Sequence, residues 1–123
     1  MARKFITYFD KQGDDYTDEL IMAVKDKLEM AENIKYVLIA SSSGESALKL
    51  AEALDDDITI VNVSHNVGFS GDNVSDISDE MIKKLEGEGI KTFQGIHAFS
   101  GAARGVTNKY GGFSPLEVVA DTL

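Results

Sequence analysis

The chain has 123 residues, of which 43% are apolar and one is proline, and this composition is sufficient for one packed domain spanning residues 1–123. Its 21 acidic residues outnumber its 12 basic residues, and the resulting formal charge of −9 disfavours nucleic acid as a partner. The absence of cysteine excludes disulfides, thiolate metal sites and cysteine nucleophiles. No apolar run reaches the roughly 20 residues that span a bilayer. We therefore expect a cytoplasmic protein that binds neither membranes nor nucleic acid.

The first half of the chain predicts two strands and two helices. Residues 5–9 are rich in β-forming side chains and predict a strand. Apolar side chains at helical spacing predict a helix over about residues 18–32. The continuous apolar run at 36–40 is typical of a strand buried on both faces, and the repeat that follows it predicts an amphipathic helix beginning near Gly44.

A second strand and helix pair follows after a long polar segment. Residues 58–63 predict a buried strand, and the polar stretch at 64–77 separates it from a helix that Ser78 caps. A loop of this length inside a small domain is usually functional. Residues 90–93 predict a short strand after that helix.

The last part of the chain predicts two short helices. Residues 100–110 form a segment closed by Gly111, a residue type that commonly ends helices. Ser114, Pro115 and Glu117 occupy the cap, first-turn and capping-box positions of a further helix.

Alternating strands and helices indicate an α/β fold with a mostly parallel sheet and helices on both faces, which is a three-layer α/β/α arrangement. In such sheets the loops that leave the carboxyl ends of the strands form the ligand crevice. The loops at 41–46, 64–66 and 96–98 meet this condition, and they contain both histidines of the chain, His65 and His97.

The turn Ser-Ser-Ser-Gly-Glu-Ser at 41–46 predicts an anion site, because it places backbone N–H groups at a helix amino terminus, where phosphate binds well. The alternative is that Ser43 only caps the helix. The turn is neither a Walker A loop nor a Rossmann fingerprint, so triphosphate hydrolysis and ordinary NAD binding lack support. Gly44→Asp is expected to place a carboxylate in the space of the anion.

Three further residue types in the loops suggest contacts with a ligand. Arg104 lies between glycines, where a bidentate phosphate contact is easy, although a surface ion pair would suit it equally. Phe69 follows Gly68 and is placed to stack on a flat ring or to fill the core. His65 and His97 lack the spacing of a metal site, so we expect hydrogen bonds to a ligand and no metal.

The segment 41–47 resembles the Thr-Lys-Ser-Gly-Arg-Ser-Ala type of loop in the carboxyl-terminal α/β domain of pyruvate kinases, where the loop holds a sugar-phosphate effector. Motifs at 37–47, 63–69 and 97–112 extend the resemblance over essentially the whole chain, to a family of small archaeal and bacterial proteins built on this domain alone. The resemblance implies this fold without the last elements of the family, and it implies no pyruvate kinase activity.

The resemblance also implies a ligand. Ser42 and Glu45 replace the Lys and Arg of the pyruvate kinase loop, which makes flavin mononucleotide (FMN) or another phosphorylated molecule a better candidate than a sugar phosphate. The expected ligand site comprises Ser41, Ser42, Ser43, Gly44, Glu45, Ser46, His65, Asn66, Gly68, Phe69, His97, Ser100, Gly101, Arg104 and Asn108.

Three functions remain open at this point. The first is a module that binds a phosphorylated ligand, and the second is a flavin-dependent or phosphate-ester enzyme with His65 or His97 as acid or base. The third is an assembly module in which the serine turn is only a helix cap. We also expect a homo-oligomer, because the helix that begins at Pro115 is short and should leave apolar surface for another subunit to cover.

Overall fold

The structure, a computed structural model, describes residues 6–10, 13, 15–31, 33–96 and 100–122. A parallel sheet has the strand order β1-β2-β3 and consists of β1 (Tyr36–Ala40), β2 (Thr59–His65) and β3 (Lys91–Gly95). The helices are α1 (Thr17–Met30), α2 (Glu45–Ala53), α3 (Asp79–Gly87), α4 (Ser100–Tyr110) and α5 (Pro115–Thr122). The predicted α/β class and the parallel pairing of the three strands are confirmed.

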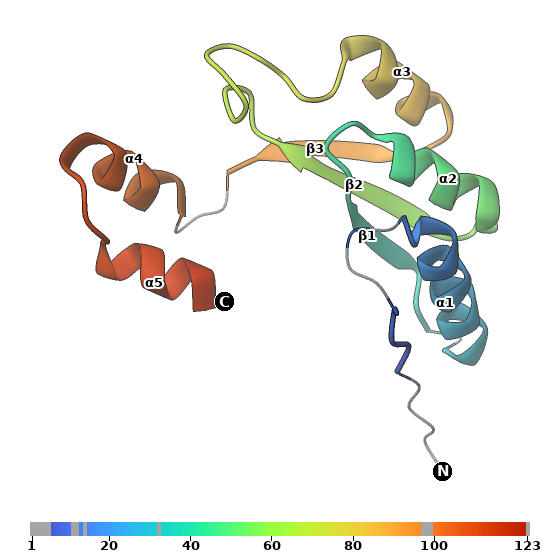
Figure 1. The fold of residues 1–123 in the computed structure, drawn as a ribbon. Coiled ribbons are helices and arrows are strands. Elements are labelled where there is room, and N and C mark those ends of the chain that lie inside the picture. The colour runs from blue at the N-terminus through green and yellow to red at the C-terminus, as the bar shows by residue number, and fades with distance from the viewer. Residues whose placement is uncertain (1–5, 11–12, 14, 32, 97–99, 123) are drawn as a thin grey trace.

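One face of the sheet forms the hydrophobic core with the first three helices. Figure 1 shows α1, α2 and α3 on the same side of the sheet. Side chains alternate along β2, so that Ile60, Asn62 and Ser64 are buried on that side. The buried apolar residues of this core are Ile21, Ala47, Leu50, Ile60, Ile77, Leu85 and Ile90.

The opposite face of the sheet is more open. Tyr36, Leu38 and Phe93 expose 66%, 70% and 60% of their surface. The strand predicted at 36–40 is present, but the expectation that it is buried on both faces is wrong. The register pairs Ala40 with Val63 and Val63 with Phe93, so these side chains form an apolar row at the carboxyl end of this face. Helix α4 lies across a pocket from the same row. Figure 1 shows α4 and α5 beyond the carboxyl end of β3, and the arrangement as a whole is consistent with the predicted three-layer α/β/α fold.

Helices α3 and α5 begin at serine caps that the sequence predicts. The Ser78 hydroxyl accepts a bond of 3.1 Å from the backbone N–H of Met81, and Ser114 accepts one of 3.2 Å from that of Glu117. The Glu117 carboxylate in turn accepts a bond of 2.7 Å from the Thr107 hydroxyl, which joins α5 to α4. None of the helices in the described ranges is long and apolar enough to cross a membrane.

The amino-terminal segment differs from the sequence-based expectation. Residues 6–9 belong to no strand, so the strand predicted at 5–9 is wrong over the part that the structure describes. The Phe9 ring stacks on the Tyr16 ring at 4.3 Å between centroids, so this apolar segment finds an aromatic partner before α1. Asp15 accepts hydrogen bonds from the N–H and the hydroxyl of Thr17, and these bonds hold the pKa of the Asp15 carboxyl below its usual value.

Candidate functional site

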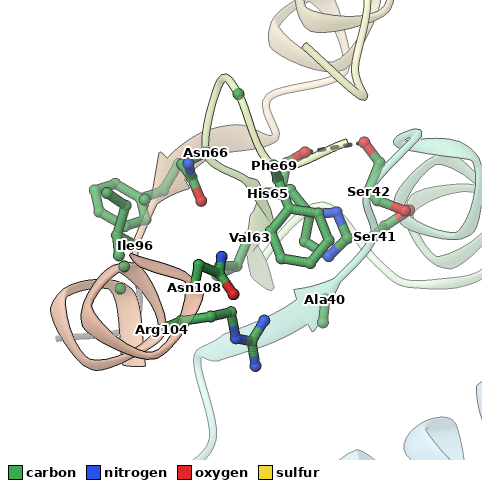
Figure 2. Close-up of a pocket in the computed structure, with 16 residues that line it drawn as sticks. Ala40, Ser41, Ser42, Val63, His65, Asn66, Phe69, Ile96, Arg104 and Asn108 are labelled. Carbon is green, nitrogen blue, oxygen red and sulfur yellow. Dashed lines mark hydrogen bonds between the residues drawn. The ribbon is translucent and has the colours of Figure 1, made fainter. Parts of the chain in front are cut away.

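A pocket of about 840 Å³ lies at the carboxyl ends of the three strands, between the open face of the sheet and helix α4 (Figure 2). Its volume falls within the range of small-molecule sites. Its described lining consists of Ala40, Ser41, Ser42, Val63, Ser64, His65, Asn66, Gly68, Phe69, Phe93, Gly95, Ile96, Gly101, Arg104, Gly105 and Asn108. The predicted gathering of loops at one edge of the sheet is therefore present.

The charge of this pocket contrasts with that of the chain. Although the chain has 21 acidic residues, no Asp or Glu is among the described residues that line the pocket. Its ionisable side chains are those of His65 and Arg104. In the described part of the chain no carboxylate forms an ion pair with Arg104, so its guanidinium remains available to an anion.

The serine turn is held by bonds within itself and to β2. The backbone N–H of Gly44 donates 3.1 Å to the buried Ser41 hydroxyl, and that of Glu45 donates 3.4 Å to the Ser43 hydroxyl. The N–H of Ser41 donates 3.1 Å to the carbonyl oxygen of Val63. Two of the amides that the sequence assigns to an anion therefore already have partners, and Ser41 and Ser42 are the turn residues that face the pocket.

Gly44 serves the packing of this turn against α3. Its φ of 88° lies in the left-handed region, which only glycine adopts at little cost. A Cβ atom at this position would lie 2.7 Å from the Met81 side chain and 3.0 Å from that of Leu85. A side chain at 44 would therefore enter the core and not the space of an anion, so the expectation for Gly44→Asp is wrong.

The long loop between β2 and α3 is compact. The N–H of Gly68 donates 2.8 Å to the carbonyl oxygen of Val74, and the N–H of Val74 donates 3.0 Å to that of Gly71. Ile77 anchors the end of the loop in the core, where only 1% of its surface is exposed. The Gln94 amide of β3 also donates 2.9 Å to the Ser75 hydroxyl. These contacts fix the loop beside the pocket.

This loop positions His65, the last residue of β2. The ring nitrogen Nδ1 of His65 lies 2.5 Å from Asp76 Oδ2. The Phe69 ring stacks on the imidazole at 3.9 Å between centroids, with 26° between the planes. Figure 2 shows the two rings together on the side of the pocket that Ser41 and Ser42 line. Hydrogen bonds from the Ser70 hydroxyl and from His65 hold the pKa of the Asp76 carboxyl below its usual value.

The predicted site residues fall into three groups. The pocket is lined by Ser41, Ser42, His65, Asn66, Gly68, Phe69, Gly101, Arg104 and Asn108. The turn residues outside its lining are Ser43, Gly44, Glu45 and Ser46. His97 lies outside the described residues, and Ser100 is described only as the first residue of α4.

Sequence reasoning missed part of the lining and the partner of His65. Val63 alternates with buried residues on β2, and Phe93 alternates with half-buried residues on β3. This period of two could have placed both on the pocket face. Asp76 is one of several acids in a polar loop, and nothing in its spacing distinguishes it from Asp72.

No protein-family model matches the chain. Across the residues that the structure describes, no three His, Asp or Glu side chains gather in a way that could hold a metal ion. The lining of the pocket offers cationic, hydroxyl, amide and aromatic groups to a ligand.

Proposed function

We propose that the protein binds a small phosphorylated molecule in the pocket between the sheet and α4, with FMN as the leading candidate. The observation that carries this proposal is the charge of the lining. On a chain of formal charge −9, the described lining contains Arg104 and His65 and no carboxylate. A pocket free of acids on an acidic protein favours an anionic ligand, because negative side chains next to a phosphate would repel it.

The distribution of other groups in the pocket supports a ligand with a phosphate, hydroxyls and a flat ring. Ser41, Ser42 and Asn108 offer hydroxyl and amide groups, while Phe69 and Phe93 offer aromatic surface. The Phe69 ring is 52% exposed, so one of its faces is available for stacking. FMN carries all three chemical features, whereas a simple sugar phosphate would leave the aromatic surface unused.

The resemblance to the pyruvate kinase domain also favours a phosphorylated ligand, but the positive charge would come from a different part of the chain. In that family the loop supplies positive charge, but here Ser42 and Glu45 occupy those positions. Arg104 of α4 offers the charge from the other side of the pocket. We therefore place the phosphate between Arg104 and Ser42 of the serine turn.

Flavin fluorescence tests this proposal. FMN titrated with the protein should lose fluorescence as its ring stacks in the pocket, and riboflavin, which lacks the phosphate, should bind at least about tenfold more weakly because it cannot form the charge-assisted contacts. Added sodium chloride should weaken FMN more than riboflavin. Equal affinity for the two flavins would contradict a phosphate site, and displacement of FMN by inorganic phosphate would support one.

A further inference from the structure

His65, which lines the pocket, is in contact with a carboxylate that does not line it. Asp76 does not line the pocket, but its Oδ2 lies 2.5 Å from His65 Nδ1. The Asp76 side chain is 16% exposed, and that of His65 is 44% exposed. Asp76 therefore contacts the imidazole without being part of the described lining of the pocket.

Asp76 is ionised at neutral pH. Hydrogen bonds from the Ser70 hydroxyl and from His65 lower the pKa of its carboxyl, because both bonds favour the charged form. A carboxylate at Nδ1 orients the imidazole and stabilises a positive charge on it. The other ring nitrogen, Nε2, is then the one that a ligand can use.

Two charged groups lie around His65, Asp76 and Arg104, and the others are neutral. The long loop contributes Asp76 and the Phe69 ring, and β3 contributes the Gln94 amide, which lies 3.4 Å from the His65 carbonyl oxygen. Ser41 and Ser42 of the β1 turn are uncharged, and α4 contributes the cation Arg104. Asp76 is thus the one carboxylate that contacts His65 among the described residues.

We propose that His65 takes up a proton when a phosphorylated ligand binds, so that an imidazolium held by Asp76 becomes the second cation of the site. This inference rests on the proposed function. The proton comes from solvent and stays on His65, and no bond of the ligand is broken. A phosphate beside Nε2 favours the charged imidazole, while Asp76 compensates that charge at Nδ1.

The proposal explains how this pocket holds a dianion with one permanent cation. Arg104 is the one permanent cation among the described residues of the lining. A histidine can supply the missing charge because it changes protonation between about pH 5 and pH 8. The second ionisation of a phosphate monoester lies near pH 6, so affinity for FMN should fall as pH rises above about 7, where the phosphate is already a dianion.

Calorimetry measures the proton directly. FMN is titrated into the protein at one neutral pH in two buffers with different ionisation enthalpies, and the difference in heat gives the number of protons bound. FMN itself exchanges protons as its phosphate changes charge, so the comparison is made between wild type and His65→Gln, in which that contribution is shared. Wild type should take up a larger number of protons, by at most about one.

The variants Asp76→Asn and Asp72→Asn form a matched pair. They separate the stabilisation of a protonated His65 by Asp76 from the general effect of one negative charge in the loop. Each removes one negative charge from the same loop, but Asp72 is exposed and contacts neither His65 nor the pocket. Charge alone predicts that both variants bind FMN more tightly, since the loop becomes less negative. The proposal predicts the opposite for Asp76→Asn, which should bind about tenfold more weakly at neutral pH and recover when the pH is lowered enough to protonate His65.

Four outcomes decide the proposal. Greater proton uptake by wild type together with weakened binding by Asp76→Asn supports it. Normal FMN binding with equal proton uptake in wild type and His65→Gln overturns it and leaves the proposed function intact. Tighter binding by both aspartate variants also overturns it. Failure of wild type to bind either FMN or inorganic phosphate overturns it together with the proposed function. Circular dichroism of each variant verifies that the fold is retained, and His65→Asn replaces His65→Gln if the latter does not fold.

Discussion

The Ser64 hydroxyl, near the end of β2, donates a hydrogen bond of 2.9 Å to the carbonyl oxygen of Ser42. Ser64 is 4% exposed and lies on the helix-covered side of the strand. The bond connects two residues that are 22 positions apart and holds the serine turn against the central strand. The position of the turn beside the pocket therefore depends on tertiary contacts as well as on the local sequence.

Ser64→Ala should disturb the turn. The variant leaves the Ser42 carbonyl without this donor, and we expect it to lower the free energy of unfolding by about 1 kcal/mol and to weaken FMN binding by a few fold. Ser43→Ala is the control, because the exposed Ser43 hydroxyl accepts only a long bond of 3.4 Å. Urea denaturation and flavin titration of both variants check this, and equal effects of the two substitutions would contradict it.

Gly44→Ala should destabilise the fold strongly. The substitution adds a Cβ at a φ of 88° and places it 2.7 Å from Met81, so we expect a loss of about 3 kcal/mol from backbone strain and overpacking together. Gly89→Ala shares the positive φ, at 75°, but has open space around the added Cβ. It should lose only about 1 kcal/mol in thermal or urea denaturation. Similar losses for both variants would show that the contact with α3 is unimportant.

Thr92→Val should stabilise the protein. The Thr92 hydroxyl is buried without a hydrogen-bond partner in the described structure, next to Asn62, its register partner on β2, which is 0% exposed. Replacing the hydroxyl by a methyl group removes the cost of burying it, and we expect a gain of about 1 kcal/mol. Thr107→Val is the opposite case, because this hydroxyl donates to Glu117, and it should lose a similar amount. A loss of stability in Thr92→Val would indicate that its hydroxyl has a partner.

Self-association should depend on the open face of the sheet. We expect a homo-oligomer, and Leu38 is a suitable probe because it is 70% exposed on the edge strand β1 and does not line the pocket. Leu38→Lys should shift the mass in light scattering towards the monomer, since it places a charge in the apolar contact. Leu20→Lys, at an exposed position of α1, should not have this effect. A wild-type monomer at high concentration would refute the expectation.

Much of the fold could be predicted from the sequence because local signals and tertiary packing agree. The continuous apolar run at 36–40 coincides with β1, and the caps at Ser78 and Ser114 mark the starts of α3 and α5. The strand predicted at 5–9 was wrong over the described residues, because a short run of β-forming residues does not by itself make a strand. A strand also needs a neighbour with free hydrogen-bonding groups, and sequence periodicity does not supply that information.

The site was predictable in location but not in its internal arrangement. The rule that the carboxyl ends of parallel strands gather places His65 and the serine turn at one edge of the sheet. The pairing of Asp76 with His65 is created by the path of the loop, and a sequence pattern does not encode that path. The contact of Gly44 with α3 could not be predicted, because a glycine before a helix fits both an anion site and a close helix contact.

The central claim is that the phosphate of the ligand contacts Arg104. Calorimetric titration of FMN into two variants of α4, each lacking one positive charge, tests this claim most directly. Arg104→Gln removes the guanidinium from the pocket, whereas Lys109→Gln removes a positive charge from the same helix outside the lining, where Lys109 lies 5.3 Å from the centre of the Tyr110 ring. The account predicts FMN binding by wild type, binding about tenfold weaker by Arg104→Gln, and nearly unchanged binding by Lys109→Gln. No binding of FMN by wild type, or equal affinities of the two variants, would contradict it.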